Sequence, residues 1–228
     1  MKLNIELPSG KEEISIKLHE AEEIREKIIQ NSYLKCLEVG LAYGMSANYI
    51  LSSSEKVTLV SIDPFQENDY NNLGLQNISN NGFSHRHEHI SELSITAFPE
   101  LIKSGDKYDF KFIDGDHKFE GAFIDFIFST YLINNGGMIV FDDLWMRALR
   151  LVREYVNKNR PDFKEVEFSS DNIFGFKKVS DDYRDGMYFR EFYTRKGFLK
   201  YHINRLAWEN DTLTGKLLKK LKSTIKNR

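Results

Sequence analysis

From residue 34 onward, short apolar segments alternate with longer helical ones, and this alternation constrains the fold more than any other feature of the chain. Seven segments have the length and apolar content of strands: Lys35–Val39, Val57–Ile62, Arg86–Ile90, Tyr108–Ile113, Gly137–Phe141, Phe163–Phe168 and Ile173–Val179. Helices are predicted between most of them, at Ser46–Leu51, Ile95–Lys103, Phe119–Leu132 and Trp145–Asn159. Strands that alternate with helices form βαβ units, in which a mostly parallel sheet carries helices on both faces. The sequence therefore predicts an α/β protein.

Three details bear on this prediction. The segment Met138–Phe141 is continuously apolar, as expected of a strand buried on both faces. The helix predicted at Phe119–Leu132 is apolar on two faces, so we expect the C-terminal tail or a second copy of the chain, in a homodimer, to cover one of them. Lys111 lies inside a strand predicted to be buried, where its ammonium needs a partner or a route to solvent.

The sequence pattern divides the chain into three parts. Residues 1–33 are predicted to form a short hairpin, around a Pro-Ser-Gly turn, and a helix over His19–Gln30. Residues 34–180 contain the strand–helix alternation, and residues 181–228 are predicted to be a helical C-terminal appendage. This appendage has 12 Lys and Arg against 6 Asp and Glu, and its acid-free end, 216–228, is typical of a basic amphipathic helix. Such a helix docks on the domain by its Leu face or meets an anionic partner such as a membrane surface.

Composition excludes several classes of protein. The whole chain has a net charge of −2, which argues against a polycation built for nucleic acid. The longest apolar run is four residues, so no transmembrane segment is predicted, and the first residues lack the apolar region of a secretory signal. The single cysteine, Cys36, cannot form an internal disulfide and fits a reducing compartment. We therefore expect a cytoplasmic protein.

A glycine turn after the first predicted strand is the first chemical signal. Gly40 and Gly44 allow the backbone to turn sharply and to approach a ligand without an intervening Cβ. Asp63 ends the second strand, 23 residues after Gly40, where its carboxylate can accept both hydroxyls of a ribose that lies across the carboxyl edge of the sheet. The spacing matches neither the dinucleotide motif G-x-G-x-x-G nor the triphosphate motif G-x-x-x-x-G-K-[ST]. The turn and the acid together predict a site for a nucleoside.

Three carboxylates follow two other strands. Asp114 ends one strand, and Asp142 and Asp143 end the next strand in the sequence, so all three are expected at the same edge of the sheet. Hard oxygen ligands of this kind suit Mg²⁺, Ca²⁺ or Mn²⁺, although Asp143 could instead cap the following helix. His117, three residues after Asp114, is the natural general base, because imidazole titrates near neutral pH. The alternative for His117 is a solvent-exposed position in the first turn of a helix.

These motifs together resemble the S-adenosylmethionine site of the class I methyltransferases. The stretches that carry the resemblance are Glu38-x-Gly40-x-x-x-Gly44-x-Ser46 with Asp63, Phe112-Ile-Asp114-Gly-Asp-His117, and Gly136-Gly137-Met-Ile-Val-Phe-Asp142-Asp143. The last two are similar to those of the metal-dependent small-molecule O-methyltransferases, which include the catechol, caffeoyl-CoA and macrolide-sugar enzymes. The resemblance covers residues 20–180 and implies a Rossmann-like class I methyltransferase fold with a seven-stranded, mostly parallel sheet.

The resemblance also implies roles for individual residues. The residues that would hold the cofactor are Glu38, Gly40, Gly44 and Ser46 at its methionine end, Asp63 at its ribose, Ser94 at its adenine, and Asp114. Leu93 stands where the family commonly has an acid beside the adenine. The cation, expected to be Mg²⁺, would be held by Asp114, Asp142 and Asp143, and catalysis would fall to His117 as base together with Asp114.

The function expected from these features is methyl transfer from S-adenosylmethionine to a hydroxyl of a small molecule, a sugar or a catechol-like acceptor. Two alternatives stay open: an RNA methyltransferase that uses the basic tail, and a protein of the same fold that binds the cofactor without transferring a methyl group. Three histidines at alternate positions, His85, His87 and His89, would share one face of a strand. No cysteine lies near them and the strand is expected at the edge of the sheet, so we interpret them as a solvated edge rather than a zinc site.

Overall fold

The computed structural model describes residues 3–11 and 15–192. The chain divides into two compact units, Met1–Tyr188 and Phe189–Arg228, and only residues 189–192 of the second unit are described. The basic helix predicted near the C-terminus therefore lies outside the described residues. Within the described residues, no helix has both the length and the apolar character needed to cross a bilayer.

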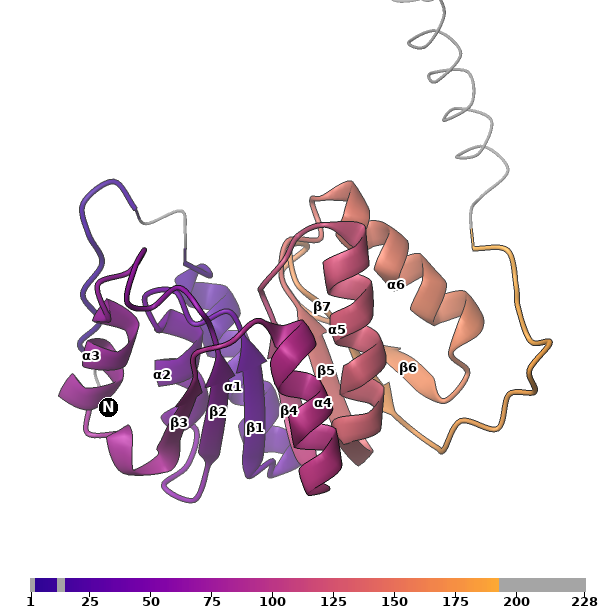
Figure 1. Ribbon diagram of the computed structural model, residues 1–228, viewed down its shortest axis with the longest axis horizontal. Helices are drawn as coiled ribbons and strands as arrows, with labels where there is room; N and C mark the ends of the chain where they lie inside the picture. The colour runs from indigo at the N-terminus through magenta and orange to yellow at the C-terminus, as the bar shows by residue number, and fades with distance from the viewer. Residues whose placement is uncertain (1–2, 12–14, 193–228) are drawn as a thin grey trace, which may run out of the picture. The chain divides into compact units, whose positions relative to one another are not determined.

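A single seven-stranded sheet forms the centre of the first unit (Figure 1). Its strands are β1 (Lys35–Val39), β2 (Thr58–Ile62), β3 (His87–Ile90), β4 (Tyr108–Ile113), β5 (Ile133–Phe141), β6 (Phe163–Val166) and β7 (Phe174–Lys178). They are ordered β3-β2-β1-β4-β5-β7-β6; β7 is antiparallel to both β5 and β6, and every other neighbouring pair is parallel. The predicted seven-stranded, mostly parallel sheet is thus confirmed.

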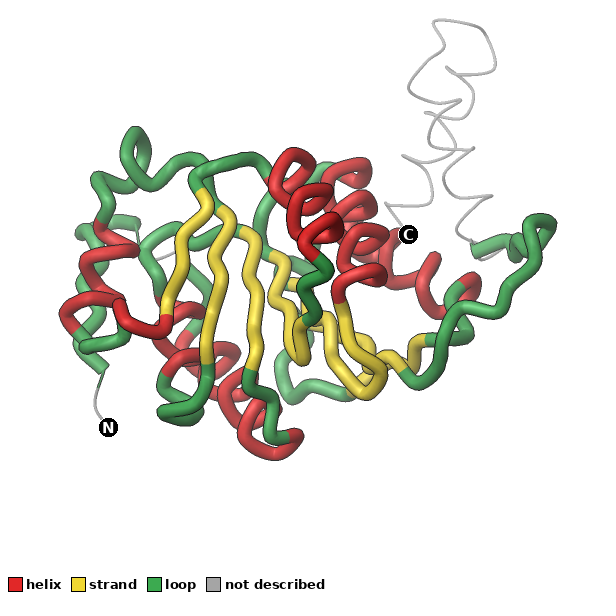
Figure 2. Tube along the Cα trace, turned by 60° about the horizontal axis from the view of Figure 1, so that its bottom comes forward, coloured by secondary structure: helices red, strands yellow, loops and turns green. Residues whose placement is uncertain are grey.

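Helices cover both faces of the sheet, as Figure 2 shows. One face packs against α1 (Leu18–Asn31), α2 (Met45–Leu51) and α3 (Leu73–Asn80). The other packs against α4 (Ser94–Ser104), α5 (Phe119–Leu132) and α6 (Arg147–Asn159), and a short 3₁₀ turn, η2 (Ser84–Arg86), precedes β3. The sequence did not predict α3, because its eight residues are rich in polar Asn, Gln and Ser and have weak helix propensity.

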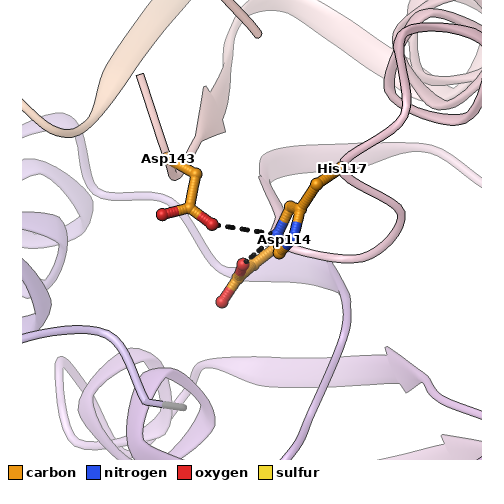
Figure 3. A group of neighbouring side chains, drawn as sticks. All are labelled: Asp114, His117 and Asp143. Atoms are coloured by element: carbon orange, nitrogen blue, oxygen red, sulfur yellow. Dashed lines mark hydrogen bonds and ion pairs between the residues drawn. The ribbon is translucent and has the colours of Figure 1, made fainter. Parts of the chain in front are cut away.

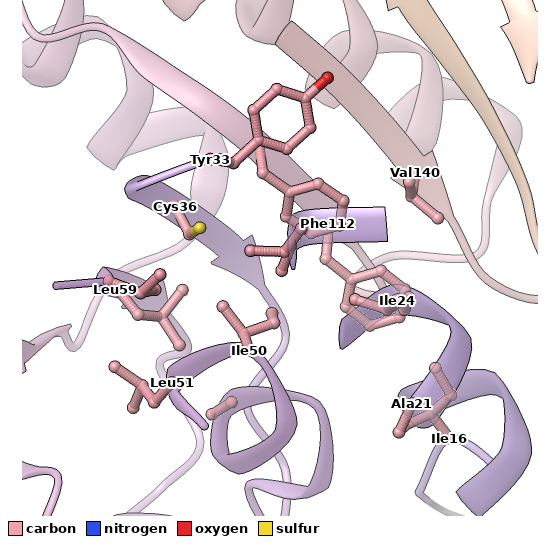
Figure 4. Close-up of a cluster of buried hydrophobic side chains, with 14 of the residues drawn as sticks. Ile16, Ala21, Ile24, Tyr33, Cys36, Ile50, Leu51, Leu59, Phe112 and Val140 are labelled. Atoms are coloured by element: carbon pink, nitrogen blue, oxygen red, sulfur yellow. The ribbon is translucent and has the colours of Figure 1, made fainter. Parts of the chain in front are cut away.

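The core follows the two-residue period of the strands. Cys36 of β1 and Phe112 of β4 face the first group of helices, where they join Ile24 and Ile50 in the buried cluster of Figure 4. Leu37, the next residue on β1, points to the opposite face. Because both faces are covered, every strand at the centre of the sheet contributes side chains to two separate parts of the core.

Both expected apolar faces of α5 contact helices of the same unit. Phe128 contacts Phe98 of α4, with ring centres 5.9 Å apart. Phe123 contacts Tyr155 of α6 edge to face, at 4.8 Å. Neither the tail nor a second copy of the chain is needed to cover these residues, and the homodimer stays a prediction.

The hairpin predicted near the N-terminus is wrong for the part of it that the structure describes: residues 3–11 and 15–17 contain no strand. Side chains of α3 take the place of a partner strand. The amide of Asn81 bonds to both the N–H and the carbonyl of Asn4, and the amide of Asn77 does the same at Glu6, all at 2.9 Å. The alternating apolar pattern indicated an extended backbone, and helix side chains satisfy its polar groups.

Lys111 is fully buried in β4, as the sequence predicted, so its ammonium has no route to solvent. Its Nζ lies 4.6 Å from the centre of the Phe98 ring and donates to Ser129 Oγ at 3.4 Å. Asp125 of α5 is also buried. Burial lowers the pKa of Lys111, and the attraction of Asp125 opposes that fall. Burial raises the pKa of Asp125 to about 6, and the hydroxyl of Ser94 and the attraction of Lys111 oppose that rise.

This arrangement predicts that the two charges depend on each other for stability. Lys111→Met and Asp125→Leu should each lower the free energy of unfolding by about 3–5 kcal/mol, because each leaves a buried charge without its opposite. The double variant should lie within about 1 kcal/mol of wild type or be more stable, since both buried charges are gone. Urea unfolding at pH 7 measures all four proteins. Additive losses in the double variant would contradict the coupling.

Candidate functional site

The carboxyl ends of the parallel strands border one cavity of about 1180 Å³. The predicted site residues that line it are Gly40, Asp63, Ser94, Asp114, His117, Asp142 and Asp143. The other three, Glu38, Gly44 and Ser46, do not line this cavity, and Glu38 and Ser46 are buried. The order of the strands explains why these residues lie at one cavity, because the loops after β1, β2, β4 and β5 emerge at the same edge of the sheet.

The glycine turn after β1 requires glycine at both predicted positions. Gly40 has φ +88°, and a Cβ added there would lie 2.0 Å from the carbonyl oxygen of Asp114. Gly44 has φ +76°, and its Cβ would lie 2.8 Å from the carbonyl oxygen of Gly74. Any side chain at Gly40 would therefore push apart the loops that follow β1 and β4. Gly40 itself lines the cavity, so the turn forms one wall of a cradle there.

Asp63 closes the turn. Its Oδ2 accepts hydrogen bonds from the backbone N–H groups of Leu41 and Ala42, both at 2.9 Å, while Oδ1 accepts from the N–H of Phe65 at 2.7 Å. The carboxylate is only 3% exposed, yet it lines the cavity. Oδ1 keeps a free lone pair for the hydroxyl of a ligand. The clamp on the turn is a second role that the sequence did not reveal.

Glu38 lies at the end of β1 and is fully buried. Its two carboxylate oxygens accept hydrogen bonds from Ser46 Oγ at 2.8 Å and from Ser61 Oγ at 2.6 Å. Burial raises the pKa of Glu38 to about 8, and the two hydroxyl donors oppose that rise. A carboxylate in this position gains strongly from a cation nearby, since the serine hydroxyls only partly replace the water it has lost.

An imidazole and two carboxylates meet at the other side of the cavity (Figure 3). His117 Nε2 lies 3.3 Å from Asp114 Oδ1 and 3.0 Å from Asp143 Oδ2. One ligand atom from each residue falls within 4.8 Å of the others, which suits a divalent cation. The hydrogen bond to Asp114 raises the pKa of His117, and Asp143 adds to this effect, while burial opposes it.

Asp142 is not part of this cluster. Its Oδ1 accepts hydrogen bonds from Asn172 Nδ2 at 2.6 Å and from the N–H of Asp143 at 2.7 Å. Burial, followed by repulsion from Asp114, raises its pKa to about 8. The structure thus groups Asp114 and Asp143 with His117. The sequence instead predicted Asp142 as the third ligand beside Asp114 and Asp143. All four residues nevertheless line the same cavity.

Three further residues complete the site, and no sequence pattern indicates them. Glu20 of α1 is buried and lines the cavity, where it accepts a hydrogen bond from Ser170 Oγ at 2.7 Å. Asn172 orients Asp142 from the loop before β7. Trp145 is 64% exposed, and its Nε1 donates to Asp143 Oδ1 at 2.6 Å. Each comes from a segment that reads as an ordinary helix or loop, so only the fold reveals its position.

Comparisons with known proteins agree with this arrangement. Residues 37–144 match the protein family described as "Methyltransferase domain", a range that includes the glycine turn and every predicted site residue. An uncharacterized protein of Acanthamoeba polyphaga mimivirus is 31% identical over 115 residues, which is 48% of this chain and 51% of the relative. The chain therefore spans about half the length of the curated relative it matches.

Several solved structures share the fold. An O-methyltransferase from Bacillus cereus in complex with SAH has a TM-score of 0.63 at 16% identity, covering 72% of this chain and 83% of its own. An O-methyltransferase of tomaymycin synthesis from Streptomyces achromogenes, in complex with SAM, has a TM-score of 0.64 at 15% identity, covering 74% and 83%. An SAH-bound methyltransferase from Podospora anserina has a TM-score of 0.63 at 12% identity, covering 76% and 83%. At these identities the likeness is one of fold.

The close approach of Gly40 to the Asp114 loop predicts an unequal effect of two glycine substitutions. Gly82 also has a left-handed φ, +78°, but an added Cβ there meets nothing within 4 Å. Gly82→Ala should therefore cost about 1 kcal/mol of backbone strain, whereas Gly40→Ala should cost at least about 3 kcal/mol, because it adds a clash with backbone. Chemical denaturation measures both. Equal losses would show that the contact at Gly40 can relax and does not constrain the site.

Proposed function

We propose that this chain, which has the class I methyltransferase fold and matches the methyltransferase domain over residues 37–144, transfers a methyl group from S-adenosylmethionine to a hydroxyl of a small molecule with the help of a divalent cation. The fold and the resemblance seen in the sequence are confirmed by the strand order and by the structural neighbours. The acceptor, the cation and the roles of individual residues are the content of the proposal.

The observation that carries the proposal is the position of Asp114. Its backbone carbonyl touches the glycine turn at Gly40, while its carboxylate contacts His117. One residue thus joins a cradle suited to a nucleoside to a cluster suited to a cation, inside a single cavity. These two sites side by side suit methyl transfer from a sulfonium to a hydroxyl that a cation activates.

The chain's own residues fit the cofactor. Gly40 of the glycine turn lines the cavity, and Oδ1 of Asp63 has the capacity to accept a ribose hydroxyl. Ser94 begins α4 at the cavity wall, beside Leu93, and fits the adenine end. Glu38 supplies negative charge beneath the methionine end. The bound cofactor supplies an electrophilic methyl group on a positively charged sulfur.

The residues at the opposite side fit a hard divalent cation and a proton acceptor. Asp114 and Asp143 offer carboxylate oxygens, and Asp142 can add a third by leaving Asn172. A cation held there supplies positive charge that lowers the pKa of an acceptor hydroxyl. His117 then accepts the hydroxyl proton at Nε2, and Trp145 fixes the orientation of Asp143.

The proposal predicts that turnover depends on the cation while cofactor binding does not. Incubation with labelled S-adenosylmethionine and pools of sugars, phenols and RNA, with and without Mg²⁺, should label a small molecule only when the cation is present. Asp143→Asn should abolish turnover yet leave the affinity for S-adenosylhomocysteine unchanged. His117→Ala should lower turnover by about 10²–10⁴-fold. Asp181→Asn, at an exposed acid outside the cavity, is the matched control.

Calorimetry with S-adenosylhomocysteine separates the parts of the proposal. Full methyl transfer in the presence of EDTA would show that turnover does not require a divalent cation. Asp142 and Asp143 would then have structural roles. Labelling of RNA alone would identify the RNA methyltransferase alternative. Absence of any binding of S-adenosylhomocysteine would contradict the assignment of the cofactor itself.

A further inference from the structure

Two of the three alternating histidines are hydrogen-bonded to residues on or just after β2, and the three are not gathered around a common point. His85 lies in η2 and is exposed, whereas His87 and His89 lie on β3. His89 Nε2 lies 2.8 Å from the backbone oxygen of Asp63, and His87 Nε2 lies 2.7 Å from Ser61 Oγ. Two of the histidines therefore reach groups on or just after β2 that adjoin the proposed cofactor site.

The contact of His87 is the outer end of a hydrogen-bonded chain across three strands. Ser61 of β2 lies opposite Glu38 of β1 in the strand register, and its Oγ donates to Glu38 Oε1 at 2.6 Å. Ser46 donates to the other oxygen of Glu38. Ser61 and Glu38 are fully buried, and His87 is partly exposed at the edge of the sheet. These hydrogen bonds thus connect β3, at the edge of the sheet, to the Glu38 carboxylate near the glycine turn.

The direction of this chain is fixed by the chemistry of a hydroxyl group. A serine hydroxyl has a single hydrogen, and an ionised carboxylate has none to offer. When Glu38 is ionised, Ser61 must give its hydrogen to Glu38, and its oxygen can then only accept from His87. The ionised state of Glu38 therefore requires that Nε2 of a neutral His87 bears a proton. Burial lowers the pKa of His87 to about 4, so its ring is neutral at physiological pH.

We propose that His87 is a positioning residue for the cofactor: its Nε2–H orients the Ser61 hydroxyl toward Glu38, and so stabilises the ionised carboxylate beneath the cationic methionine end. The inference rests on the proposed function, because it needs Glu38 to face that end of the cofactor. His87 itself does not line the cavity. It acts through Ser61 over two hydrogen bonds.

The hydrogen bonds from His87 through Ser61 to Glu38 link cofactor affinity to pH. Without cofactor the pKa of Glu38 is raised to about 8, so the group is mostly protonated at pH 7, and binding of a cation beside it releases that proton. Affinity should therefore rise as the pH rises through about 8. The other charged or titratable groups that face the chain are Asp63 and Asp114, whose negative charge raises the pKa of Glu38, and His89, whose charge lowers that of His87. They are unchanged in the variants below, so differences between the pH profiles report Glu38.

The test is calorimetric titration of S-adenosylhomocysteine, which keeps the ammonium, into wild-type protein and His87→Leu at pH 7 and at pH 9. Loss of the donor should raise the pKa of Glu38 by about one unit, which weakens binding about tenfold at pH 7 and only about twofold at pH 9. His87→Gln can donate from a similar position and should restore most of the affinity. A merely structural role of His87 would weaken binding by the same factor at both pH values.

Two further variants make the result decisive. Ser61→Ala should shift the profile in the same direction, and adding His87→Leu to it should change nothing more, because the path is already broken. If His87→Leu does not fold, Ser61→Ala makes the same test. His85→Leu is the matched control and should behave as wild type. Binding by wild-type protein with an unshifted His87→Leu profile overturns the inference alone, whereas absence of binding at any pH overturns the proposed function as well.

Discussion

The contact between the turn after β1 and the loop after β4 is the constraint on which the rest of the site depends. No side chain fits at Gly40, because a Cβ there would overlap the Asp114 carbonyl. The parallel pairing of β1 with β4 brings these two loops together, and Asp63 then holds the turn through the N–H groups of Leu41 and Ala42. The glycine turn and the first acid of the cluster of Asp114, His117 and Asp143 are thus parts of one edge of the sheet.

Several acids line the cavity close to one another, and Lys17 lies 3.9 Å from one of them, Glu20. Glu20, Asp114, Asp142 and Asp143 all line it, and burial together with mutual repulsion raises the pKa of Asp114 and Asp142. Among the described residues that contact the cluster, only His117 offers a compensating charge. Such crowding costs stability in the free protein and is offset when positive charge enters. A cationic cofactor and a divalent cation both meet that requirement.

Sequence reasoning succeeded where a residue's role follows from strand periodicity or from glycine chemistry. β1, β4 and α5 were predicted with their observed boundaries, since each has a clear apolar period. Prediction from the sequence failed where a segment's hydrogen-bond partners are side chains far away in the sequence. Asn77 and Asn81 satisfy the backbone that the pattern assigned to a hairpin, and the side chain of Asp142 turns to an asparagine thirty residues away. Seven of the predicted site residues were located at one cavity because strand ends can be read from sequence, whereas Glu20 and Trp145 reach it only through tertiary packing.

We have proposed that one edge of the sheet holds a nucleoside cofactor and a divalent cation side by side, with Asp114 between them. A crystal structure of the protein with S-adenosylhomocysteine and Mn²⁺, in which anomalous scattering locates the ion, tests this arrangement. We expect an anomalous peak within coordinating distance of the Asp114 and Asp143 carboxylates, with the cofactor bound at the glycine turn. A peak elsewhere, such as at the histidines of β3, or a cavity with the cofactor bound and no ion would contradict it.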